Sequence, residues 1–593
     1  MQELYYPYDS DWILKNRRKI RKTLLEEQTS FVTKRIAVLG GSTTHDIIQV
    51  LELFLLNEGI QPIFYESEYG QFYQDGIFGN ETLNQFNPDL IFIHTTNRNL
   101  DAVYPTVQDT KETVQQRVDE QMSMYTQLWE SLRNKFHCTI IQNNFEFPFY
   151  RTFGNQDCVD VRGRVHFIQT LNRKFSDYAE AHTDFYIHDI QYLSSIYGLE
   201  QWAQPFYWYM YKYALSLSAI PFFADNLSHM IQSIFGKNKK ALALDLDNTL
   251  WGGVIGDDGI DGIEIGQETS VGQSYLEFQS YLRAHKDKGI ILTVCSKNER
   301  ENAILGLNHP SGVLKPEDFA VIQANWEAKS ENVGKIAEYL NILPDSIVFV
   351  DDNPAEREIV RTYTSGVTVP EIGEADRYIS VLERNGFFEV TAFSEDDLKR
   401  STMYRENALR AQAQQSFTDY GEYLQSLEMK ATIRDFDTVY LPRITQLTNK
   451  SNQFNLTTKR YTESEMKAVA DNSNYIRLYG QLADRFGDNG IVSVLIGKKD
   501  GQTLHMDLWL MSCRVLKRDM ELAMLDTLVL QCRKEGIEEI YGYYYPTKKN
   551  EMVRYLYRQL GFDLIQEDGN GNSTWRLSVP AYHNQNMHIK IEN

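Results

Sequence analysis

Short apolar runs alternate with helical patterns through the first part of the chain. The apolar runs lie at 35–40, 62–65, 90–94 and 138–142, and the intervening stretches repeat apolar positions at helical spacing, as at 46–57 and 113–134. Alternating strands and helices of this kind are typical of βαβ units that build a parallel sheet. The pattern therefore predicts a first α/β domain over residues 1–235.

A second alternating series follows a basic bridge at 236–240. We predict helices at 275–288 and 330–340. The strands are predicted from apolar runs at 241–247, 289–295, 319–322, 346–352 and 366–369. This series predicts a second doubly wound parallel sheet, within residues 238–380.

The pattern changes after a charged helical connector at 394–427. Alternating runs at 504–510 and 538–545 surround a long helical stretch at 519–535. Mixed strands and helices of this kind favour an α+β domain over residues 428–580. The tail beyond that carries no pattern, and we expect it to be frayed.

Composition narrows the functional classes. The chain has 593 residues, 42% of them hydrophobic and 24% charged, which is typical of globular proteins. A net charge of −21 argues against nucleic-acid binding, because such a surface repels phosphate backbones. No apolar stretch is long enough to span a membrane and no secretory signal is visible, so we expect neither membrane insertion nor export. Five scattered cysteines indicate reduced thiols and a cytoplasmic location.

Two aspartates end the first strand of the second domain. Asp245 and Asp247 are two residues apart and precede a tight Gly252-Gly253 turn. Ligands gather where the strands of a parallel sheet end, and paired carboxylates there need a cation or a proton to offset their repulsion. Mg²⁺ is suited to this, since it prefers oxygen ligands. The alternative is an aspartate that merely caps a helix.

The following strands end in complementary groups. Ser296 closes the next strand and offers a hydroxyl for a phosphoryl oxygen, and Lys329 opens a helix where it can neutralise charge. Asp351 and Asp352 close a further strand and add oxygen ligands. An acid pair, a hydroxyl, a lysine and a second acid pair, in that order, resemble the haloacid dehalogenase (HAD) superfamily of aspartate-based phosphotransferases.

The resemblance implies a role for each group. Asp245 would be the nucleophile that forms an aspartyl-phosphate, and Asp247 the general acid and then base. The phosphoryl oxygens would be held by Thr249, Ser296 and Lys329. The ligands of Mg²⁺ would be Asp245, the Asp247 carbonyl, Asp351 and Asp352, with Asp351 as the only direct ligand of the last pair in the alternative arrangement.

The intervals between the HAD motifs are too short to contain a large inserted cap domain. A helix and a strand account for most of the chain between Asp247, Ser296 and Lys329. Because cap domains exclude water and select small substrates, an uncapped site favours a phosphate that is carried by a large molecule or delivered by neighbouring domains.

More particular motifs point to one branch of the superfamily. The segments 244–259, 292–298 and 348–354 resemble FkbH-like proteins, and so do four segments of the third domain. Those four segments are 451–462, 484–495, 512–521 and 544–550. FkbH-like proteins charge an acyl carrier protein with a glyceryl unit from 1,3-bisphosphoglycerate. The resemblance therefore implies a small phosphorylated substrate and an acyl carrier protein as partner.

Cys295 is the thiol beside the motif serine, and it has two interpretations. It is a catalytic thiol that receives the acyl group, with its thiolate favoured by Lys329 and Mg²⁺. It is otherwise a small buried hydrophobic residue, as free cysteines commonly are.

The third domain resembles the GNAT acyltransferase fold, with an altered anion-binding turn. The turn at 514–519 lacks the glycines that cradle the CoA pyrophosphate, and Asp519 places a negative charge there. A carrier-protein arm with one phosphate demands less of the turn. Candidate residues for carrier binding are Asn452, Asn455, Arg514, Lys517 and Arg518. The alternatives are a solvated basic face and loop-stabilising asparagines.

Ser42 marks a possible site in the first domain. It follows a strand and a glycine pair, as the nucleophile of SGNH hydrolases does. Those enzymes also need an Asp-x-x-His pair, whereas this chain offers Asp184 and His188 with one residue too many, and a separate His182. The domain is therefore either an esterase or a degenerate domain that docks a partner or supports the HAD site.

Two rivals to glyceryl loading remain open on the sequence. The first is a HAD phosphatase that acts on another phosphorylated sugar or protein in polyketide or surface-glycan biosynthesis. The second is a scaffold without catalytic activity. Intact acid pairs argue against the scaffold, because unpaired buried carboxylates are costly to keep.

Overall fold

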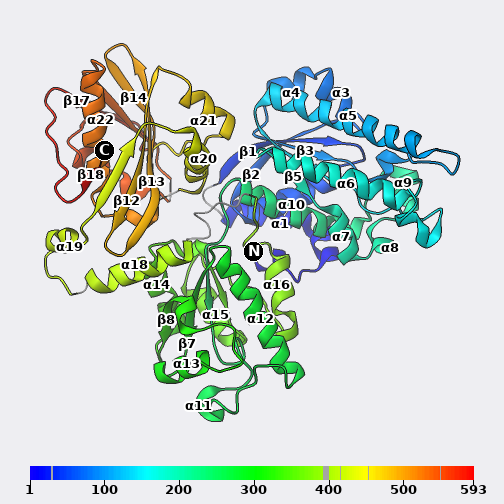
Figure 1. Ribbon diagram of the computed structural model, residues 1–593, viewed down its shortest axis with the longest axis horizontal. Coiled ribbons are helices and arrows are strands. Elements are labelled where there is room, and N and C mark those ends of the chain that lie inside the picture. The colour runs from blue at the N-terminus through cyan, green and yellow to red at the C-terminus, as the bar shows by residue number, and fades with distance from the viewer. Residues whose placement is uncertain (28–30, 392–399, 415, 452, 548, 593) are drawn as a thin grey trace. The chain divides into compact units, whose positions relative to one another are not determined.

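The computed structural model describes residues 1–27, 31–391, 400–414, 416–451, 453–547 and 549–592 (Figure 1). The chain divides into two compact units: one contains residues 1–234 with two short later segments, and the other contains the rest. In the described ranges, no helix combines the length and apolar character that crossing a membrane requires.

The first unit is built on a five-stranded parallel sheet in the order β2-β1-β3-β4-β5. Its strands are β1 (Val32–Gly40), β2 (Ile60–Glu66), β3 (Leu90–His94), β4 (Thr139–Asn143) and β5 (Phe185–His188). The four predicted strands are confirmed. The sequence analysis missed β5, which is only four residues long and has polar neighbours.

Helices cover both faces of this sheet (Figure 1). The helices α1 (Ser10–Glu27), α2 (His45–Asn57) and α10 (Ile220–Ile234) pack together, as do α5 (Lys111–Phe136) and α6 (Arg164–Ala181). The residues of β3 are completely buried, so apolar side chains from the helices exclude water from both faces of the sheet.

A pair of buried histidines lies at the carboxyl end of this sheet. The side chain of Asn143 lies between them, with its Nδ2 2.8 Å from Nδ1 of His94 and its Oδ1 3.0 Å from Nδ1 of His188. Both imidazoles are fully buried, and this burial lowers the pKa of each to about 3. Both rings are therefore neutral at physiological pH.

We predict that acid weakens the first unit through these two rings. An imidazole whose pKa is lowered by folding contributes stability above its unfolded pKa of about 6.5, and this contribution is lost as the pH falls toward 3. The free energy of unfolding should fall by about 1.4 kcal/mol per pH unit for each ring. Hydrogen exchange of the backbone amides of β3 and β5 between pH 6.5 and 4.5 measures how this free energy of unfolding depends on pH.

A histidine-to-glutamine change tests this assignment. His188→Gln should reduce the pH slope by about half, whereas the same change at the exposed His45 should leave the slope intact. An unchanged slope in His188→Gln would show that other groups set the acid sensitivity.

The second unit contains the predicted second parallel sheet, in the order β8-β7-β6-β9. The strands are β6 (Ala241–Leu244), β7 (Ile291–Ser296), β8 (Phe319–Ala324) and β9 (Ile347–Val350). The prediction of a strand at 366–369 is wrong: this segment forms only an isolated bridge between Thr368 and Val348. The helices α12 (Ser270–Asp287) and α14 (Lys329–Leu340) confirm the two helices predicted here.

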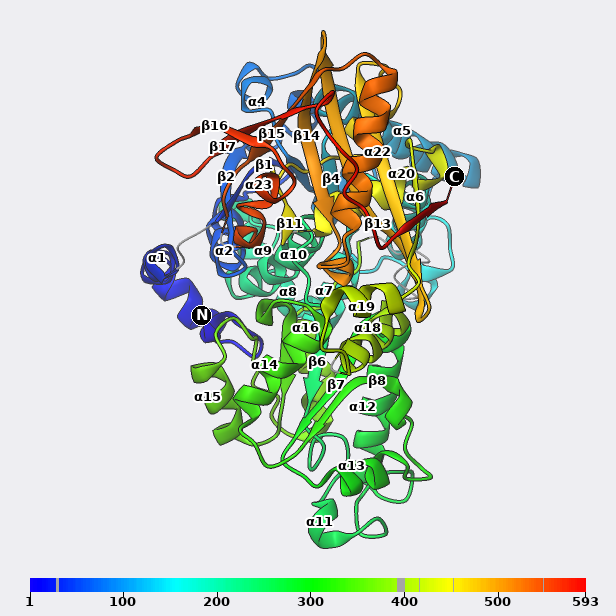
Figure 2. The ribbon, with the colours of Figure 1, turned by 90° about the vertical axis from the view of Figure 1, so that its left-hand side faces the viewer.

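The third sheet mixes parallel and antiparallel pairs, as the α+β prediction requires. Its order is β16-β17-β15-β14-β13-β12-β10-β18, with β11 (Phe454–Asn455) paired to β14. Figure 2 shows the long central strands and helix α22 (Met520–Lys534). The strands are β10 (Lys430–Arg434), β12 (Tyr475–Asp484), β13 (Gly487–Asp500), β14 (Thr503–Met511), β15 (Glu539–Tyr544), β16 (Asp563–Glu567), β17 (Ser573–Ser578) and β18 (Lys590–Glu592).

The C-terminal tail and the predicted connector at 394–427 both flank the third sheet. The prediction of a frayed tail is wrong, because β18 pairs in parallel with β10 at the sheet edge. Of the predicted connector, 394–399 and 415 lie outside the described residues. The rest forms α18 (Arg400–Gln414) and α19 (Tyr420–Ser426). Arg410 of α18 is buried in an ion pair with Asp484, at 2.8 Å from Nε to Oδ2.

Candidate active site

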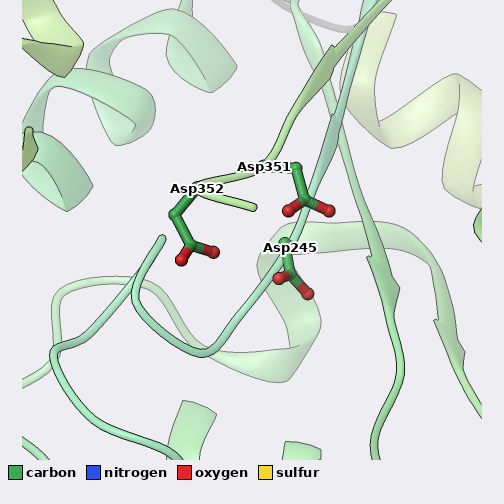
Figure 3. Close-up of side chains that lie close together, drawn as sticks. All are labelled: Asp245, Asp351 and Asp352. Carbon is green, nitrogen blue, oxygen red and sulfur yellow. The ribbon is translucent and has the colours of Figure 1, made fainter. Parts of the chain in front are cut away.

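Three carboxylates meet where two neighbouring strands end. Leu244 of β6 is in register with Val350 of β9, so the residues that follow these strands lie side by side. One oxygen from each of Asp245, Asp351 and Asp352 lies within 4.8 Å of the other two. Figure 3 shows the three side chains close together. Asp245 and Asp351 are buried, so this local negative charge is poorly screened.

Lys329 offsets part of that charge. It is the first residue of α14, and its buried Nζ lies 2.9 Å from Oδ2 of Asp245 and 2.6 Å from Oδ2 of Asp351. Burial opposes its charge, but the two carboxylates prevail and raise the pKa of Lys329 above its ordinary value. Burial and then the charge of Asp245 raise the pKa of Asp351 to about 6.

The carboxylates fit a hard divalent cation. Oδ1 of Asp245 is buried and has no hydrogen-bond partner among the described residues, so one oxygen is left for a ligand. In the described part of the chain, no other group of three or more histidines, cysteines or acidic residues is close enough to hold a metal. A cluster of carboxylate oxygens is the donor set that Mg²⁺ prefers.

Backbone and side-chain bonds hold the second acid pair in place. The N–H of Asn353 donates to Oδ1 of Asp351 at 2.9 Å, and the N–H of Asp352 donates to Oγ1 of Thr249 at 3.2 Å. Arg357 donates to the carbonyls of Asp351 and Asp352. In this structure, Thr249 therefore orients Asp352.

Asp247 is held by three donors. Its Oδ1 accepts from Nε1 of Trp251 at 2.9 Å and from the N–H of Ile255 at 3.0 Å. Its Oδ2 accepts from Nδ2 of Asn298 at 2.9 Å. Burial raises the pKa of the Asp247 carboxyl above its ordinary value, in the direction that a general acid requires.

Ser296 is buried at the end of β7, beside β6. Leu244 pairs with Val294, so Ser296 lies next to the residues that follow β6. The fold thus gathers Asp245, Asp247, Ser296, Lys329 and the Asp351–Asp352 pair at one edge of the sheet, although they are spread over more than one hundred positions of the sequence.

The structure places Cys295 in the apolar core. Its side chain is completely buried in the cluster that includes Ile291 and Phe349, and its Sγ lies 3.6 Å from the carbonyl oxygen of Lys329. Burial raises the pKa of the thiol, and this outweighs the effect of the Lys329 charge. The charge of Lys329 alone therefore does not favour the thiolate, the packing fits the buried-residue interpretation, and a catalytic role for Cys295 stays a prediction.

Two of the proposed carrier-binding arginines are engaged internally. Arg518 is buried and donates to Oδ2 of Asp484 at 3.0 Å and to Oδ1 of Asn407 at 2.8 Å. Arg514 is buried and donates through Nε to Oγ of Ser512 at 3.1 Å. Their placement on an open basic face is wrong, because the fold uses them to balance buried polar groups. Lys517 alone of the three is exposed.

The asparagine candidates and the altered turn have local partners. Oδ1 of Asn455 accepts from the N–H of Thr458 at 2.9 Å, as a loop-stabilising asparagine would. Asn452 lies outside the described residues. Asp519 has a left-handed backbone with φ 60°, and its Oδ2 lies 2.7 Å from Nδ1 of His588.

No triad forms around Ser42. Its hydroxyl is buried and has no hydrogen-bond partner among the described residues. His188 pairs with Asn143, and His182 stacks on Tyr178, so neither imidazole is in place to serve as a base. The contacts of the first unit give Ser42 no activating group.

The sequence analysis missed the supports of Asp247. Trp251 and Asn298 fall inside the motifs 244–259 and 292–298, but nothing in their spacing shows that both reach Asp247. Arg357 was missed as well, since its bonds to two backbone carbonyls have no sequence signature.

The parallel sheet, the acid pair after its first strand, the buried lysine and the second acid pair together define a protein of the HAD superfamily. Comparisons with known proteins agree. The N-terminal part of the protein BF1531 from Bacteroides fragilis, which contains a phosphatase domain and was solved with Mg, is 30% identical, with a TM-score of 0.59. The match covers 64% of this chain and 99% of that one.

The family described as FkbH, N-terminal domain, matches residues 35–232. The chain belongs to the FkbH-like family of HAD proteins.

Further solved structures match a quarter of the chain. The ribosomal-protein-S18-alanine N-acetyltransferase of Escherichia coli is 15% identical over 25% of this chain and 94% of its own, with a TM-score of 0.20. The PaiA N-acetyltransferase of Thermoplasma acidophilum, solved with coenzyme A, is 15% identical over 25% of this chain and 99% of its own, with a TM-score of 0.20. A comparison with curated proteins gives no match.

We predict that Asn298→Ala slows phosphoryl transfer without weakening substrate binding. Loss of the donor frees Oδ2 of Asp247, and a misplaced acid should lower kcat by about 10- to 100-fold at an unchanged KM. Steady-state kinetics with an alkyl phosphate measures this. An aryl phosphate should be less affected, because its leaving group needs little protonation.

A double-mutant cycle and a matched control complete the test. In an Asp247→Asn background, Asn298→Ala should add little further loss, since it acts through Asp247. Asn308→Ala removes a similar amide bond on a helix surface and should leave kcat unchanged. Additive losses in the cycle would contradict the role of Asn298.

Proposed function

We propose that this protein is a Mg²⁺-dependent enzyme that processes an acyl phosphate resembling 1,3-bisphosphoglycerate and transfers its glyceryl unit to the thiol of an acyl carrier protein. The observation that carries the phosphate chemistry is the arrangement of Asp245: one oxygen is held by Lys329, and the other is buried with no hydrogen-bond partner in the part of the chain that the structure describes. A cytoplasmic location, where thiols stay reduced, suits a thiol acceptor.

The first step is attack by Asp245 on the phosphorus. A bond forms between a carboxylate oxygen and phosphorus, and the bond from phosphorus to the leaving oxygen breaks. Asp247 gives its proton to that leaving oxygen, and the raised pKa of Asp247 supports this role. Lys329 and Ser296 hold the phosphoryl oxygens.

The second step hydrolyses the aspartyl-phosphate. Asp247, now ionised, accepts a proton from water, the water oxygen bonds to phosphorus, and inorganic phosphate leaves Asp245. Mg²⁺, when bound by Asp245, Asp351, Asp352 and the Asp247 carbonyl, would shield negative charge on the phosphoryl group. The metal-bound relative BF1531 supports this cofactor.

The elements around the site support a large or domain-delivered substrate. Between β6 and β7, the chain forms α11 (Ile255–Asp258) and α12, and between β7 and β8 it forms α13 (Arg300–Leu307) and a short 3₁₀ turn. These insertions are too short for a cap domain. A phosphate at the tip of a long arm or on a protein surface suits such a site.

The glyceryl transfer rests on the family. Membership of the FkbH-like family supports a carrier-protein partner, and the carbonyl of an acyl phosphate is already activated for attack by a thiol. Because Cys295 is buried with a raised pKa, we infer that the carrier thiol attacks this carbonyl directly. The thioester forms as the acyl–phosphate bond breaks, and the thiol proton leaves with this phosphate. The distal phosphate is hydrolysed at Asp245 and is released as a second inorganic phosphate.

A phosphatase that acts on another phosphorylated sugar or protein is the second candidate. The phosphatase domain of BF1531 favours it, and it uses the same two steps at Asp245 without an acyl acceptor. The two candidates differ in whether an acyl adduct of a carrier protein ever forms.

We predict that Asp245→Asn abolishes phosphate release. The amide cannot act as the nucleophile, so the rate should fall by about 10³-fold or more, as should the rate of the wild type after Mg²⁺ is chelated. Colorimetric phosphate release measures both. Asp257→Asn, which changes an exposed aspartate outside the cluster, is the matched control. Full activity in Asp245→Asn would overturn the proposed nucleophile.

We predict that Cys295→Ala still loads the carrier. Intact mass spectrometry of a holo carrier protein, incubated with 1,3-bisphosphoglycerate and the enzyme, should show one added glyceryl mass in both wild type and variant. Loss of loading with phosphate release preserved would instead make Cys295 the acyl-accepting thiol. If the wild type releases phosphate but never loads a carrier, the second candidate function replaces the first.

A further inference from the structure

Two arginines of the first unit lie against aromatic rings. The guanidinium carbon of Arg98 is 5.1 Å from the ring centre of Phe149 and 5.6 Å from that of Trp208. The guanidinium carbon of Arg164 is 4.6 Å from the ring centre of Tyr104 and 4.3 Å from that of Tyr150. Aromatic faces hold a guanidinium flat and leave its N–H edge free to donate.

The N–H groups of these two arginines are almost unused. Among the described residues, the guanidinium of Arg164 makes no hydrogen bond and no ion pair. Within the described ranges, the guanidinium of Arg98 has one ion-pair partner, Asp101, at 3.6 Å from nitrogen to oxygen, which is too long for a hydrogen bond. Its side chain is only 13% exposed, so these unpaired donors are also largely withdrawn from water. Such an arrangement is costly unless a ligand completes it.

The position of these residues in the sheet is that of a ligand site. The chain adds β2 on one side of β1 and then β3, β4 and β5 on the other side, so the order of strand addition changes direction between β1 and β3. Open parallel sheets bind ligands at the carboxyl ends of the strands near such a point. Arg98 follows β3, and Phe149 and Tyr150 follow β4. Ser42, whose buried hydroxyl is also unpartnered, follows β1.

A buried carboxyl group adjoins the arginines. Glu146 follows β4 and is completely buried; its Oε2 accepts from the N–H of Asn97 at 3.2 Å, and its Oε1 has no partner among the described residues. Burial raises the pKa of Glu146 to about 7, so a substantial fraction is neutral near neutral pH and can donate a hydrogen bond. The charge of Arg98 acts on Glu146, and the charges of both arginines act on Tyr104.

We propose that this edge of the first sheet binds a ligand through an oxyanion, either a carboxylate or a phosphate, with Arg98 and Arg164 as its cationic donors. The planar edge of arginine matches two oxygens of either group. The ring of Tyr150 is 59% exposed, so the site borders solvent. This site is separate from the HAD site, and it holds whether or not the proposed function does.

The competing explanation is purely structural. The two arginines would then serve only to pack the aromatic rings, and Glu146 would be a buried group satisfied by water. Two acidic groups restrict which donors an anion can reach. Asp157 already accepts from the backbone N–H of Arg164 at 3.1 Å, at the start of α6, and Asp101 lies beside Arg98. Only the guanidinium edges are therefore offered to an anion.

Fluorine NMR on the full chain separates the two explanations. The eight tryptophans are labelled as 5-fluorotryptophan, and the resonances of Trp208 and Trp251 are assigned with Trp208→Phe and Trp251→Phe. Trp208 reports on the arginine site and Trp251 on the HAD site. Inorganic phosphate and acetate are titrated separately, with chloride at equal ionic strength as the reference.

We expect at least one of the two anions, beyond the effect of chloride, to shift the Trp208 resonance along a saturable curve. Arg98→Gln and Arg164→Gln should each weaken that response by about tenfold or more, because each loses a charged donor. Arg98→Lys keeps the positive charge but loses the two parallel donors of the guanidinium, so its response should be intermediate between those of the wild type and Arg98→Gln. Arg173→Gln is the matched control, since Arg173 lies on α6 with Arg164 and its side chain is exposed.

The two anions distinguish the possible sources of the oxyanion. A response to phosphate alone identifies a phosphorylated ligand, and a response to acetate identifies a carboxylate. The proposal is overturned if neither anion moves the Trp208 resonance beyond chloride, or if Arg164→Gln and Arg98→Lys respond as the wild type does. A shift of Trp251 alone would place all anion binding at the HAD site and would also overturn it.

Discussion

The charge balance at the ends of β6 and β9 is the constraint on which the candidate active site depends. Two adjacent strands of a parallel sheet each end in a carboxylate, and their register forces these groups together inside the protein. Such a pair is unstable without positive charge, and Lys329 supplies one unit of it between Asp245 and Asp351. One lysine cannot balance three carboxylates, so the remaining negative charge favours a divalent cation.

Hydrogen bonds hold the aspartates of the candidate active site in fixed positions. Asp247 is fixed by donors from two different loops. Asp351 accepts from the N–H of Asn353, Asp352 donates its own N–H to Thr249, and Arg357 donates to the carbonyls of both aspartates. Holding these groups in advance reduces the reorganisation that a transferring phosphoryl group would demand. The apolar core beneath the site, which includes Cys295, supplies the rigid base for this arrangement.

Arginines elsewhere in the chain show the same rule and one departure from it. Arg410 and Arg518 share Asp484 in the third region, so a buried cluster there is internally balanced. Arg98 and Arg164 of the first unit have aromatic neighbours but almost no acceptors. The first pair is explained by stability, because both guanidiniums pair with the buried Asp484 and Arg410 also pairs with Glu406. The second pair lacks such acceptors, because packing on rings does not satisfy the guanidinium N–H groups, and the proposed oxyanion would supply them.

The order of most elements and the chemical types at the HAD site follow from the sequence alone. Apolar runs separated by helical patterns predicted both parallel sheets except for β5 and a wrong strand at 366–369, and acid, hydroxyl and lysine at successive strand ends identified the superfamily. Both results depend on local periodicity, which a chain displays whatever its partners in space. The short strand β5, with its polar neighbours, and the last pairing of β18 escaped, since their stability comes from neighbouring strands and not from their own residues.

Only the tertiary structure decided what each polar group faces. Cys295 and Ser296 are consecutive, yet Cys295 contributes to the core beneath the sheet; alternation along β7 turns successive side chains to opposite faces, and only the packing of α14 shows which face is the core. Arg514, Arg518 and Lys517 look alike in sequence, but the first two bond inside the protein and the third is exposed. Burial and pairing are properties of contacts between distant segments, so a linear pattern cannot specify them.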